Sequence, residues 1–293
     1  MKTSYISNIV LVLFIIILFW YSDSFLTPDL SVNTITDTQT SQIKHITIKR
    51  ENRDNIELQK SSTGWHIDHP IQAEANNTRI NLLLSLLTST PYNQLRLPAS
   101  ESLAQFGLDP VKLSIQLNDQ VFVFGDTDPI SKHRYILYHQ IIYLISDNIT
   151  PMLNANAASF INNRLLPIAK NINKIQLPNI NEEGFISNEL LTLSLADGVW
   201  QSDSEQTTDK LKFIVDSWQH AYAIQVQPLT DTELNNITGY PVNIWQEHKS
   251  DPSKFLVQIN DKGLFIIHLT NKLKYQFPAA LKNQLFIHYS ESE

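Results

Sequence analysis

The feature that most constrains the fold of this chain is one pattern that occurs twice. A Trp one or two residues after a Gly, Trp65 and later Trp200, precedes in each half a segment with apolar residues at positions i, i+3, i+4 and i+7. These positions are Ile80, Leu83, Leu84 and Leu87 in the first half, and Leu211, Ile214, Val215 and Trp218 in the second. This spacing is typical of a helix with one buried face. We therefore expect two amphipathic helices, the first capped by Asn77 or Thr78, with Trp65 and Trp200 buried in the cores.

Other segments of the two halves match in the same order. Leu58 precedes Trp65 at the spacing at which Leu193 precedes Trp200. The further matches are residues 43–49 with 172–178, 95–98 with 224–228, 107–110 with 239–241, and 113–119 with 255–261. Ordered matches of this kind indicate internal duplication. The predicted fold class is α+β, with two tandem repeats that are each a mostly antiparallel sheet and a packed helix.

The amino-terminal segment predicts a transmembrane helix. Residues 3–22 contain no charged side chain, and residues 9–21 are all apolar. Such a run spans the hydrocarbon core of about 30 Å. Lys2 lies before it and Asp23 after it, which favours an amino terminus in the cytoplasm. The alternative is a cleaved signal peptide, but the long apolar run and the Asp in Ser22-Asp23-Ser24 fit a cleavage site poorly.

These observations divide the chain into five predicted segments. They are a transmembrane anchor at residues 1–22, a flexible tether at 23–42, a first α+β repeat at 43–150, a connecting helix and linker at 151–171, and a second α+β repeat at 172–290.

Composition excludes several classes of function. The chain has no Cys, which rules out disulfides, thiolate metal sites and a Cys nucleophile. A net charge of -7 without a Lys/Arg cluster argues against a nucleic-acid partner. The 7 Gly residues form no phosphate-binding loop, and no Gly-x-Ser-x-Gly elbow is present.

The strongest candidate for a metal site is the cluster His66, Asp68 and His69. On an extended segment, His66 and Asp68 point to one side while His69 points to the other, so the three cannot chelate without a bend. The matching residues 201–203 contain no His. We therefore predict a strand edge here, with no metal and no cofactor.

The candidate catalytic groups are also better explained by structure. Asp109 next to Pro110 could be a general acid, but Gly-Leu-Asp-Pro is ordinary turn chemistry after a helix stop. The pair Glu182-Glu183 lies in polar loop sequence, and His133-Arg134 precedes a strand. No catalytic residue is assigned.

The motif around Trp65 carries a family resemblance. Residues 64–70, the Leu-rich helix, residues 106–110, Tyr135 and residues 142–144 together resemble the domain of unknown function 4340, over roughly residues 43–230. The second half departs from the pattern, because residues 239–241 lack the Leu-Asp. The resemblance implies a membrane-anchored bacterial envelope protein. Some relatives occur beside gliding-type ATP-binding cassette transport systems, which implies an accessory role.

Three functions are therefore considered. We favour a non-enzymatic interaction module, anchored in the bacterial inner membrane as a single-pass protein, with its carboxy-terminal domain in the periplasm and a transporter or other envelope assembly as its partner. The second is a small-molecule or glycan binding protein that uses the cleft between the repeats. The third is a hydrolase whose carboxylates meet only in the fold.

Overall fold

A computed structural model describes residues 34–96, 102–167, 170–180 and 185–287. The predicted anchor at 1–22, most of the tether and the Glu182-Glu183 pair lie outside these residues. Across the described ranges, no helix is long and apolar enough to cross a membrane.

The first unit is a nine-stranded antiparallel sheet in the described part of the chain, with the order β4-β3-β2-β1-β6-β7-β8-β9-β5. Its elements are η1 (Thr40–Gln42), β1 (His45–Arg50), β2 (Arg53–Ser61), β3 (Gly64–His69), β4 (Ala73–Glu74), α2 (Asn77–Leu84), η2 (Ser85–Thr88), β5 (Asn93–Arg96), η3 (Leu103–Phe106), β6 (Leu113–Leu117), β7 (Gln120–Thr127), β8 (Arg134–Tyr138) and β9 (Ile141–Ile145). Short helices α3 (Thr150–Leu153) and η4 (Ala157–Phe160) follow the last strand.

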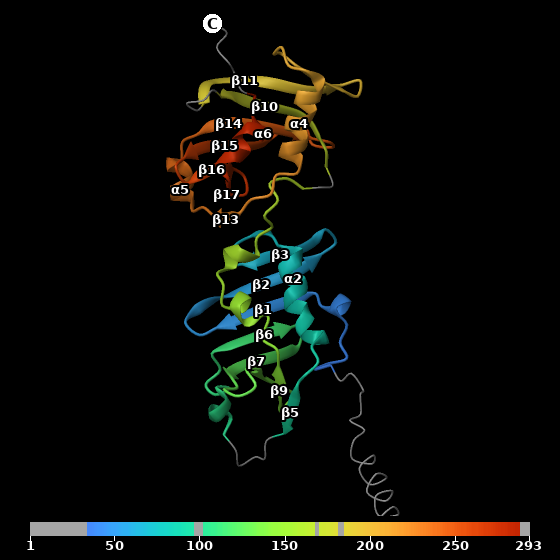
Figure 1. Cartoon of the computed structure of the whole chain (residues 1–293), viewed down its shortest axis with the longest axis vertical. Coiled ribbons are helices and arrows are strands. Elements are labelled where there is room, and N and C mark those ends of the chain that lie inside the picture. The colour runs from blue at the N-terminus through green and yellow to red at the C-terminus, as the bar shows by residue number, and fades with distance from the viewer. Residues whose placement is uncertain (1–33, 97–101, 168–169, 181–184, 288–293) are drawn as a thin grey trace, which may run out of the picture.

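The second unit is an eight-stranded antiparallel sheet of the described residues, with the order β12-β11-β10-β14-β15-β16-β17-β13. Its elements are β10 (Ile172–Ile180), β11 (Phe185–Ala196), β12 (Val199–Ser202), α4 (Thr208–Gln219), β13 (Gln225–Pro228), α5 (Asp231–Asn236), β14 (Tyr240–Gln246), β15 (Ser253–Asn260), β16 (Gly263–His268), β17 (Leu273–Phe277), η5 (Ala279–Leu281) and α6 (Lys282–Leu285). The two sheets follow one another along the long axis (Figure 1). The α+β class with mostly antiparallel sheets is confirmed.

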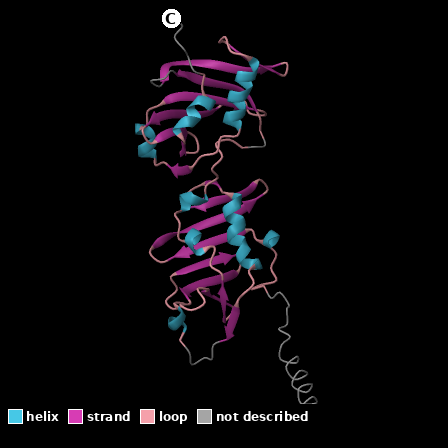
Figure 2. Cartoon of the chain, in the orientation of Figure 1, coloured by secondary structure: helices cyan, strands magenta, loops and turns pink. Residues whose placement is uncertain are grey.

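The two predicted helices cover one face of each sheet (Figure 2). All eight apolar positions of the two stripes are buried, as the spacing predicted. The first helix begins and ends differently from the prediction. Its N-cap is Asn76, not Asn77 or Thr78, because the Asn76 side-chain oxygen accepts hydrogen bonds from the backbone N–H of Thr78 at 3.1 Å and of Arg79 at 3.2 Å. After Leu84 the α-helix tightens into η2, which carries Leu87.

The two marker Trp residues differ in burial. Trp65 is 5% exposed, as predicted. The prediction that Trp200 is buried is wrong, since its side chain is only half-buried against the core. The reason is its position on β12, an edge strand that pairs with β11 on one side and with no strand of the described residues on the other. In the first unit β4 pairs with β3, so the strand that carries Trp65 is not at the edge of its sheet. The fully buried Trp of the second unit is Trp218, whose indole N–H donates to the Leu285 carbonyl at 2.7 Å.

The Gly-Leu-Asp-Pro turn is a structural element. Gly107 ends η3 in the left-handed conformation with φ 66°, and Leu108 is buried. The turn packs closely on β7, because a Cβ at Gly125 would lie 2.3 Å from the Phe106 carbonyl oxygen. A side chain at that position would separate the turn from the sheet.

One of the matches between the halves is displaced by a strand. Residues 113–117 form β6, which pairs with β1. Residues 255–260 lie in β15, whereas the strand that pairs with β10 is β14. Tyr240–Gln246, not residues 255–261, therefore occupies in its sheet the position that Leu113–Leu117 occupies in the first.

Candidate functional site

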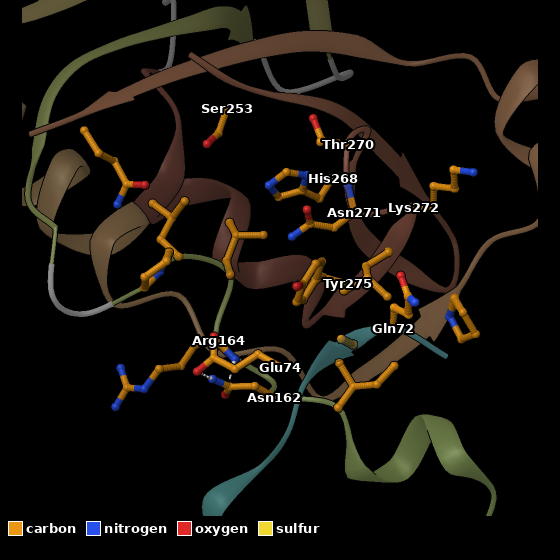
Figure 3. A pocket seen from close by; sticks show the side chains of 18 of the residues that line it. Gln72, Glu74, Asn162, Arg164, Ser253, His268, Thr270, Asn271, Lys272 and Tyr275 are labelled. Atoms are coloured by element: carbon orange, nitrogen blue, oxygen red, sulfur yellow. Dashed lines mark hydrogen bonds between the residues drawn. The ribbon is translucent and has the colours of Figure 1, made fainter. Parts of the chain in front are cut away.

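A cavity of about 990 Å³ lies where the two units meet. Its lining comes from the β3–β4 turn of the first unit, from residues 161–167 of the connector, and from one end of the second sheet. Figure 3 shows side chains from these three sources around one space. A concave site formed at a junction of two units is a common place for ligand binding.

The second sheet changes from apolar to polar where it reaches this cavity. Along β14, β15 and β16, inward-facing positions are apolar for most of their length and end in Gln246, Ser253 and His268. The apolar inward positions are Val242, Ile244, Phe255, Val257, Leu264 and Ile266. Register places the three polar residues at one end of the sheet, because Ile244 pairs with Ser253 and Phe255 pairs with His268. This end of the core face is therefore a polar floor, which also includes Tyr275 of β17.

Gln246 is the most deeply buried member of the polar floor, with 1% of its surface exposed. Its side-chain N–H donates to the Lys170 carbonyl at 2.8 Å. Its Oε1 atom is buried and accepts no hydrogen bond from any described residue. Leaving such an acceptor unsatisfied costs about 1–3 kcal/mol, a cost that a donor from a water or a ligand would remove.

His268 is held in its neutral form. Burial and the charge of Lys249 lower the pKa of His268 to about 4. Its ring packs edge-on against Phe255 at 4.6 Å, and its Nδ1 atom accepts a hydrogen bond from the Asn271 backbone N–H at 3.3 Å. A neutral imidazole that accepts at Nδ1 carries its proton on Nε2. The Nε2–H is thus a donor, and none of the described residues accepts from it.

Two hydroxyl groups complete the polar floor. Tyr275 is 4% exposed, and burial, with a contribution from Glu74, raises the pKa of its hydroxyl above the ordinary range. Ser253 is 9% exposed. Neither hydroxyl has a hydrogen-bond partner among the described residues, and both side chains border the cavity (Figure 3). Each can donate one hydrogen bond and accept others.

The charged groups around the cavity are either exposed or in contact with other side chains. Glu74 accepts a hydrogen bond from the Asn162 side chain at 2.9 Å. The Lys272 ammonium pairs with Asp231 at 2.5 Å, and the Arg164 guanidinium lies over the Tyr222 ring at 5.9 Å. His248, Lys249 and Asp251 of the β14–β15 loop are exposed. Charge therefore lies at the rim, and the floor is neutral.

The residues singled out in the sequence lie outside this site. His66 Nδ1 contacts the Gly64 carbonyl at 3.2 Å, whereas Asp68 and His69 are exposed at the end of β3. Among the described residues, no group of three His, Asp or Glu side chains could hold a metal ion. Asp109 is exposed in its turn, and Arg134 is paired with Asp147. Sequence reasoning missed the polar floor, whose one signal was the break in apolar alternation at the ends of three neighbouring strands.

A second, more open hollow of about 710 Å³ lies beside Arg50 and Arg53. Both guanidinium groups donate to backbone carbonyls of the segment that follows α3. Arg50 donates to the Ala155 carbonyl at 2.6 Å, and Arg53 donates to the Asn154 carbonyl at 2.8 Å. These bonds fix the α3–η4 segment on the first unit, so we assign this hollow a structural role.

Fold and cavity define a class: a protein of two antiparallel sheets with packed helices and a polar cavity at their junction. The family model for a domain of unknown function, DUF4340, matches residues 65–238, and the chain belongs to this family. The match confirms the resemblance seen around Trp65. It runs from β3 into the second unit and ends before β14, so the polar floor lies beyond it. Comparisons with curated proteins and with solved structures gave no match.

Proposed function

We propose that this chain is a non-enzymatic binding protein, held at the outer face of a bacterial inner membrane by residues 1–22, that takes up a small molecule in the junction cavity. The observation that carries the proposal is the cavity of about 990 Å³ at the junction, whose lining includes Gln246, a residue with a buried Oε1 acceptor that has no partner among the described residues. Folded proteins satisfy nearly all buried polar groups, and an exception calls for a ligand or water.

The two-unit architecture is part of the proposal. We infer that the units are tandem repeats of one ancestral fold. Identical strand orders support this: β3-β2-β1-β6-β7-β8-β9-β5 in the first sheet and β12-β11-β10-β14-β15-β16-β17-β13 in the second. Each unit also has its main helix in the chain after its third strand, α2 after β3 and the short β4, and α4 after β12. The uncharged run at residues 3–22 supports the anchor.

The chemistry of the cavity favours binding over catalysis. His268 uses Nδ1 to accept from a backbone N–H, so that nitrogen does not serve as a base for the nearby Ser253. Glu74 is hydrogen-bonded to Asn162, and Asp251 lies exposed on a loop. A pair of convergent acid and base groups, which hydrolysis needs, is not formed by the described lining.

Native mass spectrometry tests the proposal. The full chain, purified from its own membranes, should carry a small bound molecule, and Ser253→Phe should lose it because the new ring fills the cavity floor. Ser41→Phe, on exposed η1, is the matched control and should retain the molecule. Equal adducts on both variants, or a wild-type chain without any adduct, would refute binding in this cavity.

A second candidate function is an accessory subunit of a transporter or other envelope machine. It is favoured by β5, an edge strand whose four residues are all exposed, next to Tyr92 with 70% exposure. Such an edge offers backbone groups to a partner strand. Crosslinking in native membranes should capture the partner chain, and Leu95→Pro on β5 should abolish capture. Recovery of the wild-type protein as a monomer, where known envelope complexes survive, would exclude this function.

A further inference from the structure

We propose that the junction cavity recognises a neutral, polyhydroxylated molecule, a sugar or a related polyol, through Gln246, Ser253, His268 and Tyr275. This inference rests on the proposed function and names the ligand class of the same site.

The first unit serves as an internal reference for the polar floor. Phe122 stacks on Tyr138 at 4.4 Å in the first sheet, and Phe255 packs on His268 at 4.6 Å in the second. Strand order and register give these aromatic pairs the same position in their sheets. By the same register, Gln120 in the first sheet and Ser253 in the second occupy equivalent positions, because Gln120 pairs with Leu117 as Ser253 pairs with Ile244.

In the first unit a tight turn fills this corner. The Gln120 side chain donates to the Thr38 hydroxyl at 2.6 Å, and the β6–β7 turn consists of Asn118 and Asp119. The Asn118 side-chain oxygen caps the backbone N–H groups of Lys44 and His45 at 3.0 and 3.1 Å. A tight turn and these hydrogen bonds therefore close most of the corner of the first sheet, although the Gln120 Oε1 atom is buried without a partner among the described residues.

In the second unit the same corner stays open. The β14–β15 loop spans residues 247–252 and forms one wall of the cavity instead of a tight turn. Ser253 stands where the first unit has Gln120, and His268 stands where it has Tyr138. Neither has a counterpart of Thr38 among the described residues. The same fold thus has a tight turn at this corner in the first unit and a longer loop beside a cavity in the second.

The hydrogen-bond donors and acceptors of the polar floor determine which class of ligand matches it. Gln246 Oε1 needs a donor, and His268 Nε2–H needs an acceptor. The hydroxyls of Ser253 and Tyr275 can act as donor or as acceptor. A carboxylate or a phosphodiester group only accepts and leaves Gln246 unsatisfied, whereas an ammonium only donates and leaves His268 unsatisfied. A ligand hydroxyl does both, so several hydroxyl groups on one neutral ligand match the floor.

Charge leads to the same conclusion. The neutral floor offers no counter-ion, and an ion that leaves water without a partner loses far more free energy than a hydroxyl does. Among the cations that line the cavity, Lys272 pairs with Asp231 and Arg164 lies over Tyr222. Lys249, whose charge acts on His268, is exposed on the β14–β15 loop. The ring of Tyr275 adds an apolar surface suited to the C–H face of a sugar.

Saturation-transfer difference NMR on the full chain, in a detergent without a sugar headgroup, tests the inference. The neutral probes are glucose, maltose and sorbitol, and the charged probes of similar size are glucuronate and glucosamine. The neutral probes should bind and the charged probes should not. Ser253→Ala and His268→Phe should each raise Kd about 10-fold, the value of one hydrogen bond near 1.4 kcal/mol. His45→Phe, at an exposed position of β1, should leave Kd unchanged.

The outcomes separate this inference from the proposed function. Binding of charged probes alone, weakened by Ser253→Ala, overturns the neutral ligand class and leaves the binding function intact. Neutral binding that neither variant weakens places the sugar elsewhere and overturns the site. Absence of transfer with all five probes overturns the inference, while the adduct in native mass spectrometry decides the proposed function separately. Circular dichroism and Tm establish that each variant is folded, and Ser253→Ala removes only one oxygen atom.

Discussion

At the scale of single residues, His268 links the cavity to stability. Burial and Lys249 lower its pKa to about 4, from an ordinary value of 6.5. Between these pH values the unfolded chain binds a proton that the folded chain does not, so the free energy of unfolding decreases as pH falls from 6.5 to 4. The loss amounts to roughly 3 kcal/mol when the window is fully crossed.

The prediction for His268 is a difference between two pH profiles. Urea unfolding of wild type and His268→Phe at pH 7, 5.5 and 4.5 should show a larger loss of stability for the wild type. Other groups that face the cavity, among them Glu74, Asp251, Lys249, Lys272 and Tyr275, are present in both proteins and cancel in the comparison. Parallel profiles would mean that His268 titrates normally in the fold.

The sequence revealed residues of the core more readily than residues of the site. A buried helical stripe such as Ile80, Leu83 and Leu84 repeats with a period that a sequence displays. Gln246, Ser253 and His268 lie far apart in sequence, and each is one polar residue at a strand end, where polar residues are common. Only the sheet register brings them onto one face. The cavity could therefore not be predicted without knowing which strands are neighbours.

At the scale of elements, the cap of α2 connects the helix to the connector. The Asn76 side-chain oxygen accepts from two N–H groups of the first helical turn, and its amide donates to Asn163 at 3.4 Å. Asn76→Ala should lower the free energy of unfolding by about 1 kcal/mol. Asn76→Asp keeps the cap and loses the donation to Asn163, so chemical denaturation should show a smaller loss. Equal losses for both variants would assign the effect to Asn163 and not to the cap.

The edge strands give a second prediction, for the marker Trp residues. Trp65→Ala should cost about 3–5 kcal/mol, because β4 covers β3 and the side chain is 5% exposed. Trp200→Ala should cost clearly less, since β12 is an edge and Trp200 already contacts solvent. Urea denaturation of the two variants provides the comparison. Similar losses would show that Trp200 packs as tightly as Trp65.

The sequence patterns predicted which segments are helices and strands, but they did not predict which strands pair with each other. Alternation predicted the strands around Trp65, and the helical stripe predicted α4 with its four buried positions. The match of residues 113–119 with 255–261 failed because both are alternating strands followed by Asn-Asp, and composition alone cannot tell β6 from β15. Pairing with β1 or with β14 is a long-range property of the sheet.

At the scale of the whole molecule, the connector bonds both units. In the predicted linker, Met152, Leu153 and Phe160 are buried in the core. The connector residues Asn162 and Asn163 then form backbone hydrogen bonds with the first and the second unit, respectively. Asn162 N–H donates to the Glu74 carbonyl at 2.8 Å on one side, and Ala223 N–H donates to the Asn163 carbonyl at 2.8 Å on the other. This segment therefore sets the width of the cavity that it lines.

Asn163 is the residue on which we expect the relative orientation of the units to depend most. Its side chain donates to the Ala223 carbonyl at 2.9 Å and accepts from Asn76, so it bonds to both units. Asn163→Ala should loosen the junction while each sheet stays folded. Because the chain has no Cys, spin labels can be placed uniquely at Ser62→Cys in the first unit and Asp261→Cys in the second.

Electron–electron double resonance between these labels should give a broader distance distribution for Asn163→Ala than for the parent. Asn235→Ala, exposed on α5, is the matched control and should leave the distribution unchanged. The sugar probe should also bind more weakly to Asn163→Ala, because a ligand that must first order the two walls of its site loses that free energy from binding. A distribution as narrow as that of the parent would show that the apolar contacts around Phe160 and Leu165, and not the Asn163 bonds, fix the two units.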